Sequence, residues 1–253
     1  MRTKEFHMKS ESQYGQRVAD LELEKKRVAD AIVQRILWRQ GQHPHNPLYV
    51  SDGSSASFVF CKYLQRWIKE GDETLRVWTN NLDVPMQVLC EEGAPEKVSI
   101  HSAPGEFSYK YCGNFGRETE AWIEQHCGRS TCILAVTALD ADLGPCGRGE
   151  DAKAIKAAVM KAANVLIVVA DHTKLRCPRD PGAAAAPDEW RRWRDERSAD
   201  GRLFVVTTRS LNVPVTFGRF PLKGAVDART PDQIESENFA RLSTQLGQQL
   251  ITV

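Results

Sequence analysis

Apolar residues recur along this chain with two alternating patterns. Short runs rich in valine, isoleucine and leucine, such as Val165–Ala170, predict buried β-strands. Between these runs the apolar positions recur every three or four residues, as at Val28, Ile32 and Ile36, which predicts amphipathic helices. The predicted strands cover residues 48–50, 75–78, 97–101, 131–138, 165–170 and 203–207, and the predicted helices cover residues 19–40, 56–70, 84–90, 117–126, 150–163 and 232–250. Strands that alternate with helices predict an α/β fold with a mostly parallel sheet and helices on both faces.

The same pattern suggests a domain organisation. Residues 1–18 are polar without a period and are expected to form a flexible leader, whereas residues 19–253 are expected to form a single domain. Residues 176–200 break the alternation with three prolines and an alanine run, which predicts an inserted surface segment, partly helical near Trp190. Residues 210–253 form a C-terminal extension with a proline-punctuated connection and a helix.

Composition and charge exclude several classes of protein. The 253 residues hold 34 Lys plus Arg against 33 Asp plus Glu, so the net charge of +1 gives no global positive field, and direct DNA binding is not expected. No apolar run approaches the roughly 20 residues that span a bilayer, so we expect no membrane contact. The polar start lacks the apolar core of a secretory signal, and the seven cysteines are scattered, which together favour a cytoplasmic protein with reduced thiols.

Two loops that follow predicted strands have the chemistry of an anion site. In Ser51–Ala56 a glycine and hydroxyl side chains precede a helix N-terminus, where exposed N–H groups can hold a phosphate. The alternative is that Ser and Asp are ordinary N-caps of that helix. Thr79 and Asn80 offer similar chemistry after the next strand, although Asn at a strand end often only makes a turn.

Two further loops add charged groups. A glycine-rich stretch, residues 144–149, leads to Glu150, Lys153 and Lys156 on the first turns of a helix. Glu150 and Lys153 are three residues apart, so a solvated ion pair is the alternative to a role in a site. Asp171 and Lys174 follow the most apolar strand of the chain. Because ligands of open α/β sheets bind beyond the carboxyl ends of the strands, the four loops together predict a site for phosphate and hydroxyl groups.

These motifs, in this order, resemble the effector-sensing domain of DeoR/GlpR-type transcriptional regulators. The segments that carry the resemblance are SDGSSA, VWTNN, LAVTALDADLG, EDAKAIKAAVMKAA and VLIVVADHTKL, within residues 22–210. The resemblance implies a Rossmann-like fold shared with ribose-5-phosphate isomerase, glucosamine-6-phosphate deaminase and the CoA transferases. It also implies that a phosphosugar binds across the strand ends.

The resemblance assigns roles to individual positions. It implies a phosphate site at Asp52, Gly53, Ser54 and Ser55, contacts from Thr79 and Asn80 to neighbouring oxygens, positive charge from Lys156 and Lys174, and orienting carboxylates at Glu150 and Asp171. The chain departs from the family pattern at Ala103–Glu106 and at Thr137–Asp140. The leader is also too short for the winged helix-turn-helix of these regulators, so we expect a sensor without its own DNA reader.

Three functions remain open from the sequence. The first is a sensor of a small phosphorylated metabolite that self-associates and contacts a protein partner. The second is a sugar-phosphate isomerase or deaminase, with Glu150 and Asp140 as candidate catalytic carboxylates. The third is an interaction module with a degenerate pocket, which would be favoured if Lys156 and Lys174 pointed away from the loops or were salt-bridged.

Other chemistry is not expected. No cofactor is implied, and no metal site is predicted, because His43, His45, Cys127 and Cys132 lack a second matched pair at zinc spacing. The run Trp190–Arg194 has the residue types of a nucleic-acid patch. Neighbouring acids balance its arginines, so a solvated amphipathic helix is the favoured interpretation.

Overall fold

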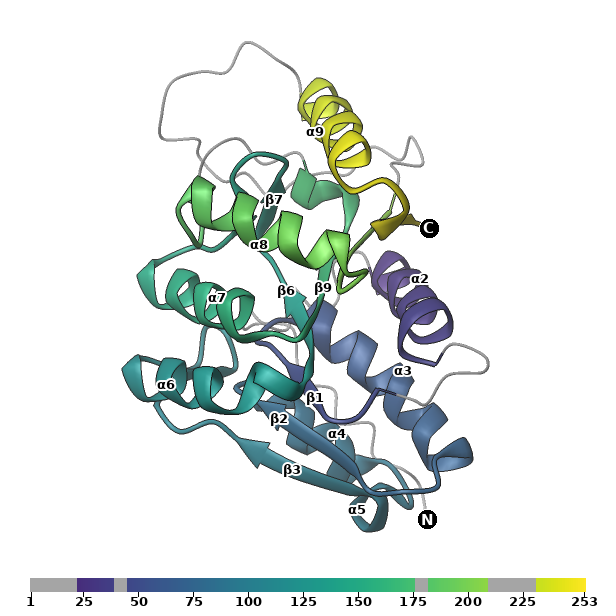
Figure 1. Ribbon diagram of the computed structural model, residues 1–253. Helices are drawn as coiled ribbons and strands as arrows, with labels where there is room; N and C mark the ends of the chain where they lie inside the picture. The colour runs from purple at the N-terminus through teal and green to yellow at the C-terminus, as the bar shows by residue number, and fades with distance from the viewer. Residues whose placement is uncertain (1–21, 39–44, 176–181, 209–230) are drawn as a thin grey trace.

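The computed structural model contains a central sheet of seven parallel strands, drawn in Figure 1. It describes residues 22–38, 45–175, 182–208 and 231–253. The strands are β1 (Leu48–Val50), β2 (Leu75–Thr79), β3 (Val98–Ser102), β6 (Thr131–Ala135), β9 (Val165–Ala170), β10 (Leu203–Thr207) and β11 (Leu250–Thr252). Every neighbouring pair in the sheet is parallel. The predicted α/β, Rossmann-like fold is therefore confirmed.

The strand order places a reversal of direction in the middle of the sheet. The order is β11-β10-β9-β6-β1-β2-β3, so the chain first builds outward from β1 through β2 to β3. It then returns to the other side of β1 and builds outward again through β6, β9, β10 and β11. Such a switch point opens a crevice outside the carboxyl ends of the strands, where open α/β sheets bind ligands. Here the switch point lies between β1 and β6.

Helices cover both faces of the sheet (Figure 1). One face carries α2 (Glu22–Ile32), its π-helical continuation η1 (Val33–Leu37), α3 (Ser54–Glu70), α4 (Asp83–Cys90) and α5 (Ala94–Lys97). The other carries α6 (Arg117–His126), α7 (Glu150–Ala162), α8 (Pro187–Ala199) and α9 (Pro231–Leu246). In α3, for example, Phe60, Leu64 and Trp67 recur at helical spacing and are buried against the sheet. The two faces thus form two hydrophobic cores, one on each side.

Two short hairpins were not predicted from the sequence. β4 (Glu106–Ser108) pairs with β5 (Gly113–Phe115), and β7 (Ala138–Asp140) pairs with β8 (Gly144–Cys146), both antiparallel. The predicted strand 131–138 therefore ends at residue 135, and the expected loop 144–149 begins as a strand. Gly144 has a positive φ of 74°, and a Cβ there would lie 2.5 Å from the ring of Trp190. Only glycine fits this turn, because both the backbone conformation and the tryptophan exclude a side chain.

Helix α8 differs from the surface segment that the sequence predicts. Most of its charged residues are exposed, and Arg191 pairs with Asp188, as expected of a solvated face, but Arg197 is buried. Trp190 and Trp193, however, are buried in the core between α8 and the sheet. The tryptophans are packed inside the protein, so they are not presented for stacking on bases. The first part of the predicted insertion, residues 176–181, lies outside the described residues.

The C-terminal region adds an edge strand that the sequence pattern does not reveal. The predicted helix 232–250 ends at Leu246, a short 3₁₀ turn η4 (Gly247–Gln249) follows, and β11 then pairs with β10. Residues 210–230 of the predicted extension and the predicted leader 1–18 lie outside the described residues. None of the helices in the described ranges combines the length and apolar character needed to cross a bilayer.

Candidate functional site

The loop after β1 crosses the switch point and is held tightly against β6. The Ser51 backbone N–H donates to Ile133 O at 3.0 Å, and the Ser51 hydroxyl accepts from the Ala135 N–H at 2.9 Å. Gly53 then turns the chain with a φ of 105°. A Cβ at this position would lie 3.1 Å from the Cβ of Ala135. The close approach and the positive φ both explain why glycine occupies this position.

The predicted alternative of side-chain N-capping does not occur at α3. The N-cap residue is Gly53, and no side-chain cap hydrogen bond is made. The first turn of α3 therefore presents its N-terminal N–H groups and the positive end of the helix dipole without a side-chain cap. Ser54 is half-buried and Ser55 is buried at this helix start. This is the local geometry that binds anions at helix N-termini.

Asp52 uses its side chain in a buried ion pair instead. Lys156 Nζ, from α7 on the opposite face of the sheet, lies 3.4 Å from Asp52 Oδ2. The exposed fractions of the two side chains are only 3% for Lys156 and 7% for Asp52. Asp52 Oδ1 is buried and has no hydrogen-bond partner among the described residues. A buried carboxylate oxygen without a donor is costly, so Asp52 retains an acceptor that a ligand hydroxyl could use.

A second charged group approaches the same helix start from the 3₁₀ turn η3 (His172–Leu175), which follows β9. Lys174 Nζ donates to Ser55 Oγ at 2.9 Å and lies 3.3 Å from Asp171 Oδ2. The Thr173 hydroxyl donates to the other oxygen of Asp171. The first turn of α3 and the turn that follows β9 are thus brought together, although more than a hundred positions separate them.

Asp171 is held in its charged form. Burial alone would raise the pKa of this carboxyl group, because a charge is poorly solvated inside the protein. The positive charge of Lys174, the hydrogen bond from Thr173 and the charge of Lys25 outweigh burial, so the pKa of Asp171 lies below its usual value. Asp171 is therefore an acceptor only, able to receive hydrogen bonds from hydroxyl or ammonium groups.

Thr79 and Asn80 are fully buried and bonded within the protein. The Thr79 hydroxyl donates to Val50 O at 2.7 Å. Asn80 Oδ1 accepts from the Tyr49 hydroxyl at 2.8 Å and from the Asp52 backbone N–H at 3.0 Å, and its Nδ2 donates to Asn114 O. In this arrangement the two residues position the loop that carries Asp52, and their polar atoms are occupied.

The two candidate catalytic carboxylates are engaged in local contacts. Glu150 is exposed at the start of α7 and pairs with Lys153 at 2.9 Å, the solvated ion pair that the sequence left open. Asp140 Oδ1 accepts from the N–H groups of Asp142 and Leu143, which stabilises the turn between β7 and β8. That hairpin lies beside η3. Of the sequence-derived residues, Asp52, Ser55, Lys156, Asp171 and Lys174 converge, whereas Glu150 does not join them.

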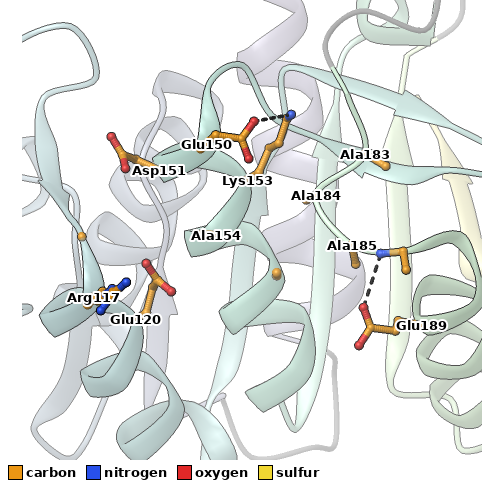
Figure 2. A pocket seen from close by; sticks show the side chains of 13 residues that line it. Arg117, Glu120, Glu150, Asp151, Lys153, Ala154, Ala183, Ala184, Ala185 and Glu189 are labelled. Carbon is orange, nitrogen blue, oxygen red and sulfur yellow. Dashed lines mark hydrogen bonds and ion pairs between the residues drawn. The ribbon is translucent and has the colours of Figure 1, made fainter.

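Glu150 lines a separate open cavity of about 660 Å³ on the outer side of α7. Figure 2 shows Arg117 and Glu120 of α6 on one side of this cavity and Ala183 to Ala185 with Glu189 on the other. Ala154 lies between them on α7, and Lys153 reaches Glu150 at one end. Lys153 and Lys156 are on the same helix but have different partners. Lys153 pairs with Glu150 at this cavity, whereas Lys156 is buried and pairs with Asp52.

Sequence reasoning gave no role to three residues at the turn that carries Asp171. Glu24 of α2 bonds to His172 of η3, 148 positions away, and the charge of Lys25 of α2 acts on Asp171. A signal was present for Lys25, which is buried at a position that continues the apolar stripe of Val28 and Ala29. A lysine at such a position indicates a buried partner. No group of three or more potential metal ligands occurs in the described parts of the chain.

Solved structures of ribose 5-phosphate isomerase are among the similar folds. The enzyme from Methanocaldococcus jannaschii is 13% identical with a TM-score of 0.40, and the match covers 60% of this chain and 54% of that one. The Plasmodium falciparum enzyme is 13% identical with a TM-score of 0.37, covering 60% and 52%. eIF2B beta from Chaetomium thermophilum is 11% identical with a TM-score of 0.38, covering 60% and 43%. The chain thus spans about half the length of the solved structures that it matches.

The family comparison is based on sequence. No curated protein sequence matches the chain. The family model described as the DeoR C terminal sensor domain matches residues 22–179, which include α2, the loop after β1, α7 and η3. This match covers more than half of the 253 residues. The chain therefore belongs to the DeoR C-terminal sensor domain family.

Proposed function

We propose that this domain senses a small phosphorylated metabolite, a phosphosugar, at the loops around the start of α3. The observation that supports this most is the bond from Lys174 Nζ to Ser55 Oγ, 2.9 Å long, at a helix N-terminus that has no side-chain cap. A phosphate at this position would meet backbone N–H groups, serine hydroxyls and an ammonium group together. The lysine side chain is 17% exposed, so this end of the cluster is accessible.

The sugar end of the ligand would be bound by the two aspartates. Asp52 Oδ1 has no partner among the described residues, and Asp171 is an ionised acceptor. Carboxylate oxygens accept hydrogen bonds from hydroxyl groups, whereas they repel phosphate. The arrangement therefore fits a ligand with an anionic end and a hydroxyl-bearing end, which describes a sugar phosphate better than a free anion.

One feature also fits the alternative of an interaction module. Lys156 and Lys174 are both ion-paired, with Asp52 and Asp171 respectively. Neither lysine points away from the loops, however, since Lys156 reaches Asp52 beside the start of α3 and Lys174 bonds to Ser55. A phosphate would compete with Asp171 for Lys174, so ligand binding is expected to rearrange this pair.

Thermal unfolding against a panel of sugar phosphates, nucleotides and CoA esters tests the proposal. A ligand that binds only the folded protein raises the melting temperature by mass action. The affinity is then measured for the compound that raises the melting temperature most. Lys174→Ala should weaken the binding of this compound by roughly 1.5–3 kcal/mol, or about 10- to 150-fold, because a charge-assisted hydrogen bond is lost. Lys153→Ala is the matched control, because Lys153 pairs with the exposed Glu150 outside the cluster.

The outcomes separate the three candidate functions. Equal affinity in Lys174→Ala and Lys153→Ala would place the site elsewhere. No shift with any compound would favour the interaction module. Consumption of the binding compound, followed by NMR, would favour an isomerase or deaminase, whereas binding without turnover supports the sensor.

A further inference from the structure

A buried hydrogen-bonded cluster joins helix α2 to the carboxyl ends of β9 and β10. Glu24 Oε2 of α2 lies 2.7 Å from His172 Nδ1 and accepts from the Thr208 hydroxyl at 2.6 Å. Thr208 in turn accepts from the His172 backbone N–H at 2.9 Å. Each of the three residues contacts the other two, so we call Glu24, His172 and Thr208 the α2 clasp.

The clasp is shielded from solvent and connects distant segments. The exposed fractions are 2% for His172, 3% for Thr208 and 19% for the Glu24 side chain. Thr208 and Glu24 are 184 positions apart in the chain. Hydrogen bonds to a charged group are strengthened where water is excluded, so these contacts can hold α2 against the strand ends.

A second residue of α2 acts electrostatically on the same turn. Lys25, the next residue of α2, is buried, and its positive charge helps to lower the pKa of Asp171. Adjacent residues of α2 thus act on adjacent residues at the end of β9, with Glu24 on His172 and Lys25 on Asp171.

The clasp also shares its backbone with the proposed ligand site. His172 lies between Asp171 and Lys174, and Lys174 bonds to Ser55 at the start of α3. His172 Nε2 is buried and has no partner in the described structure. An unsatisfied buried nitrogen costs free energy, so His172 has a hydrogen-bonding capacity that this position of η3 leaves unused. A different position of η3 can change both the ligand contacts and the clasp.

We infer that the α2 clasp couples the position of α2 to occupancy of the site at Ser55 and Lys174, which makes α2 the element that reports the ligand. The inference rests on the proposed function. A phosphate bound between Ser55 and Lys174 ties η3 to the start of α3, and His172 on the same turn ties η3 to Glu24 of α2. Fixing η3 at the ligand site therefore holds α2 more firmly through the clasp. Because coupling is reciprocal, a variant that releases α2 must weaken ligand binding by the same factor by which the ligand stabilises the held position of α2.

Hydrogen exchange with inorganic phosphate as the probe tests the coupling. Phosphate should slow the exchange of the α2 amides, residues 22–32, in the wild-type protein. Glu24→Ala should abolish this protection and raise the Kd for phosphate by roughly fivefold or more, the usual scale of coupling between sites. Glu22→Ala is the matched control, because Glu22 is on the same helix but makes an exposed ion pair with Lys26. It should leave both quantities unchanged.

Two further experiments show whether Glu24 positions η3 or only stabilises the fold. Glu24→Gln keeps an oxygen that accepts from Thr208 and His172, so it should restore most of the phosphate affinity that Glu24→Ala loses. Without ligand, Glu24→Ala should speed exchange in residues 171–175, whereas Glu22→Ala should not. If Glu24→Ala does not fold, the Gln variant and the wild-type exchange data still decide the question.

The possible failures are distinguishable. If phosphate binds to the wild type but α2 exchange is unchanged, or if Glu24→Ala and Glu22→Ala bind phosphate equally, the coupling is overturned while the proposed site stands. If the wild type binds neither phosphate nor any compound of the sugar-phosphate panel, the proposed function fails and the coupling to a ligand fails with it.

Discussion

The buried ion pair between Asp52 and Lys156 offers the sharpest test of the site geometry. We expect Lys156→Met, which keeps the volume of the side chain but removes its charge, to destabilise the fold strongly. Two unit charges 3.4 Å apart attract each other by about 5 kcal/mol at an effective dielectric constant of roughly 20. Desolvation offsets much of this attraction when the pair forms, but a variant that removes one partner leaves the other charge buried and unpaired.

The expected cost of Lys156→Met is about 3–5 kcal/mol, the range for breaking a buried pair on one side. At about 2–4 °C per kcal/mol for a chain of this size, the melting temperature should fall by on the order of 10 °C. Asp52→Asn should also destabilise, because it strands the ammonium group of Lys156. The double variant should cost clearly less than the sum of the two single variants, since neither charge is then left alone.

Urea unfolding of the four proteins of this cycle gives the coupling energy. Lys153→Met is the control, because its partner Glu150 has a side chain that is 90% exposed and exposed pairs contribute about 0–1 kcal/mol. A cost of less than about 1 kcal/mol for Lys156→Met, equal to that of the control, would refute the reasoning. So would a double variant whose cost equals the sum of the single costs.

Three further predictions concern the loops around this pair. Asn80→Ala should destabilise the protein by about 2–4 kcal/mol in urea unfolding, because it strands buried groups that now bond to both ends of the amide; a cost within the error of the method would contradict this role. Because Asp171 has a lowered pKa in the folded state, it contributes stability above about pH 4 that is lost as the pH falls through the folded pKa. Asp171→Asn should therefore flatten the fall of melting temperature in acid, and an unchanged slope would show that another group is responsible. Gly53→Ala should cost more than Gly116→Ala by thermal unfolding: their φ angles are 105° and 100°, but only at Gly53 would a Cβ meet another atom within 4 Å.

The arrangement of strands was largely predictable from the sequence. β1, β9 and β10 have the predicted bounds, because each is a short apolar run ended by a polar or turn-forming residue. The alternation with helices then implies a parallel sheet, and parallel strands bring their carboxyl-end loops to one edge. For this reason the convergence of Asp52, Ser55 and Lys174 followed from the order of elements, before any distance was known.

Where the structure differs from the sequence prediction, the difference depends on tertiary contacts that the spacing of apolar residues does not reveal. The stretch from Thr131 through Leu139 is apolar except for its two threonines, and a threonine such as Thr137 is common inside strands, so the pattern does not mark the change from β6 to the hairpin strand β7. Likewise the charged residues of α8 hide the fact that Trp190 and Trp193, three positions apart, form a buried stripe. In both cases the packing partner, and not the local sequence, determines where the strand ends or which side chains are buried.

The charged residues of the site show what a finer sequence analysis could have found. Lys25 and Lys156 both occupy positions in the apolar stripes of their helices, and both are buried. Lysine is rarely buried unless an acid is near, so each predicts a carboxylate at the sheet that its helix covers. Lys156 reaches Asp52, and the charge of Lys25 acts on Asp171. Because α2 and α7 lie on opposite faces of the sheet, the two faces each contribute one buried cation to the same strand ends. The cluster of lysines and carboxylates is therefore close to neutral without a ligand. An anionic ligand would have to displace a carboxylate from a lysine in order to bind. We therefore expect ligand binding and movement of the surrounding elements to occur together.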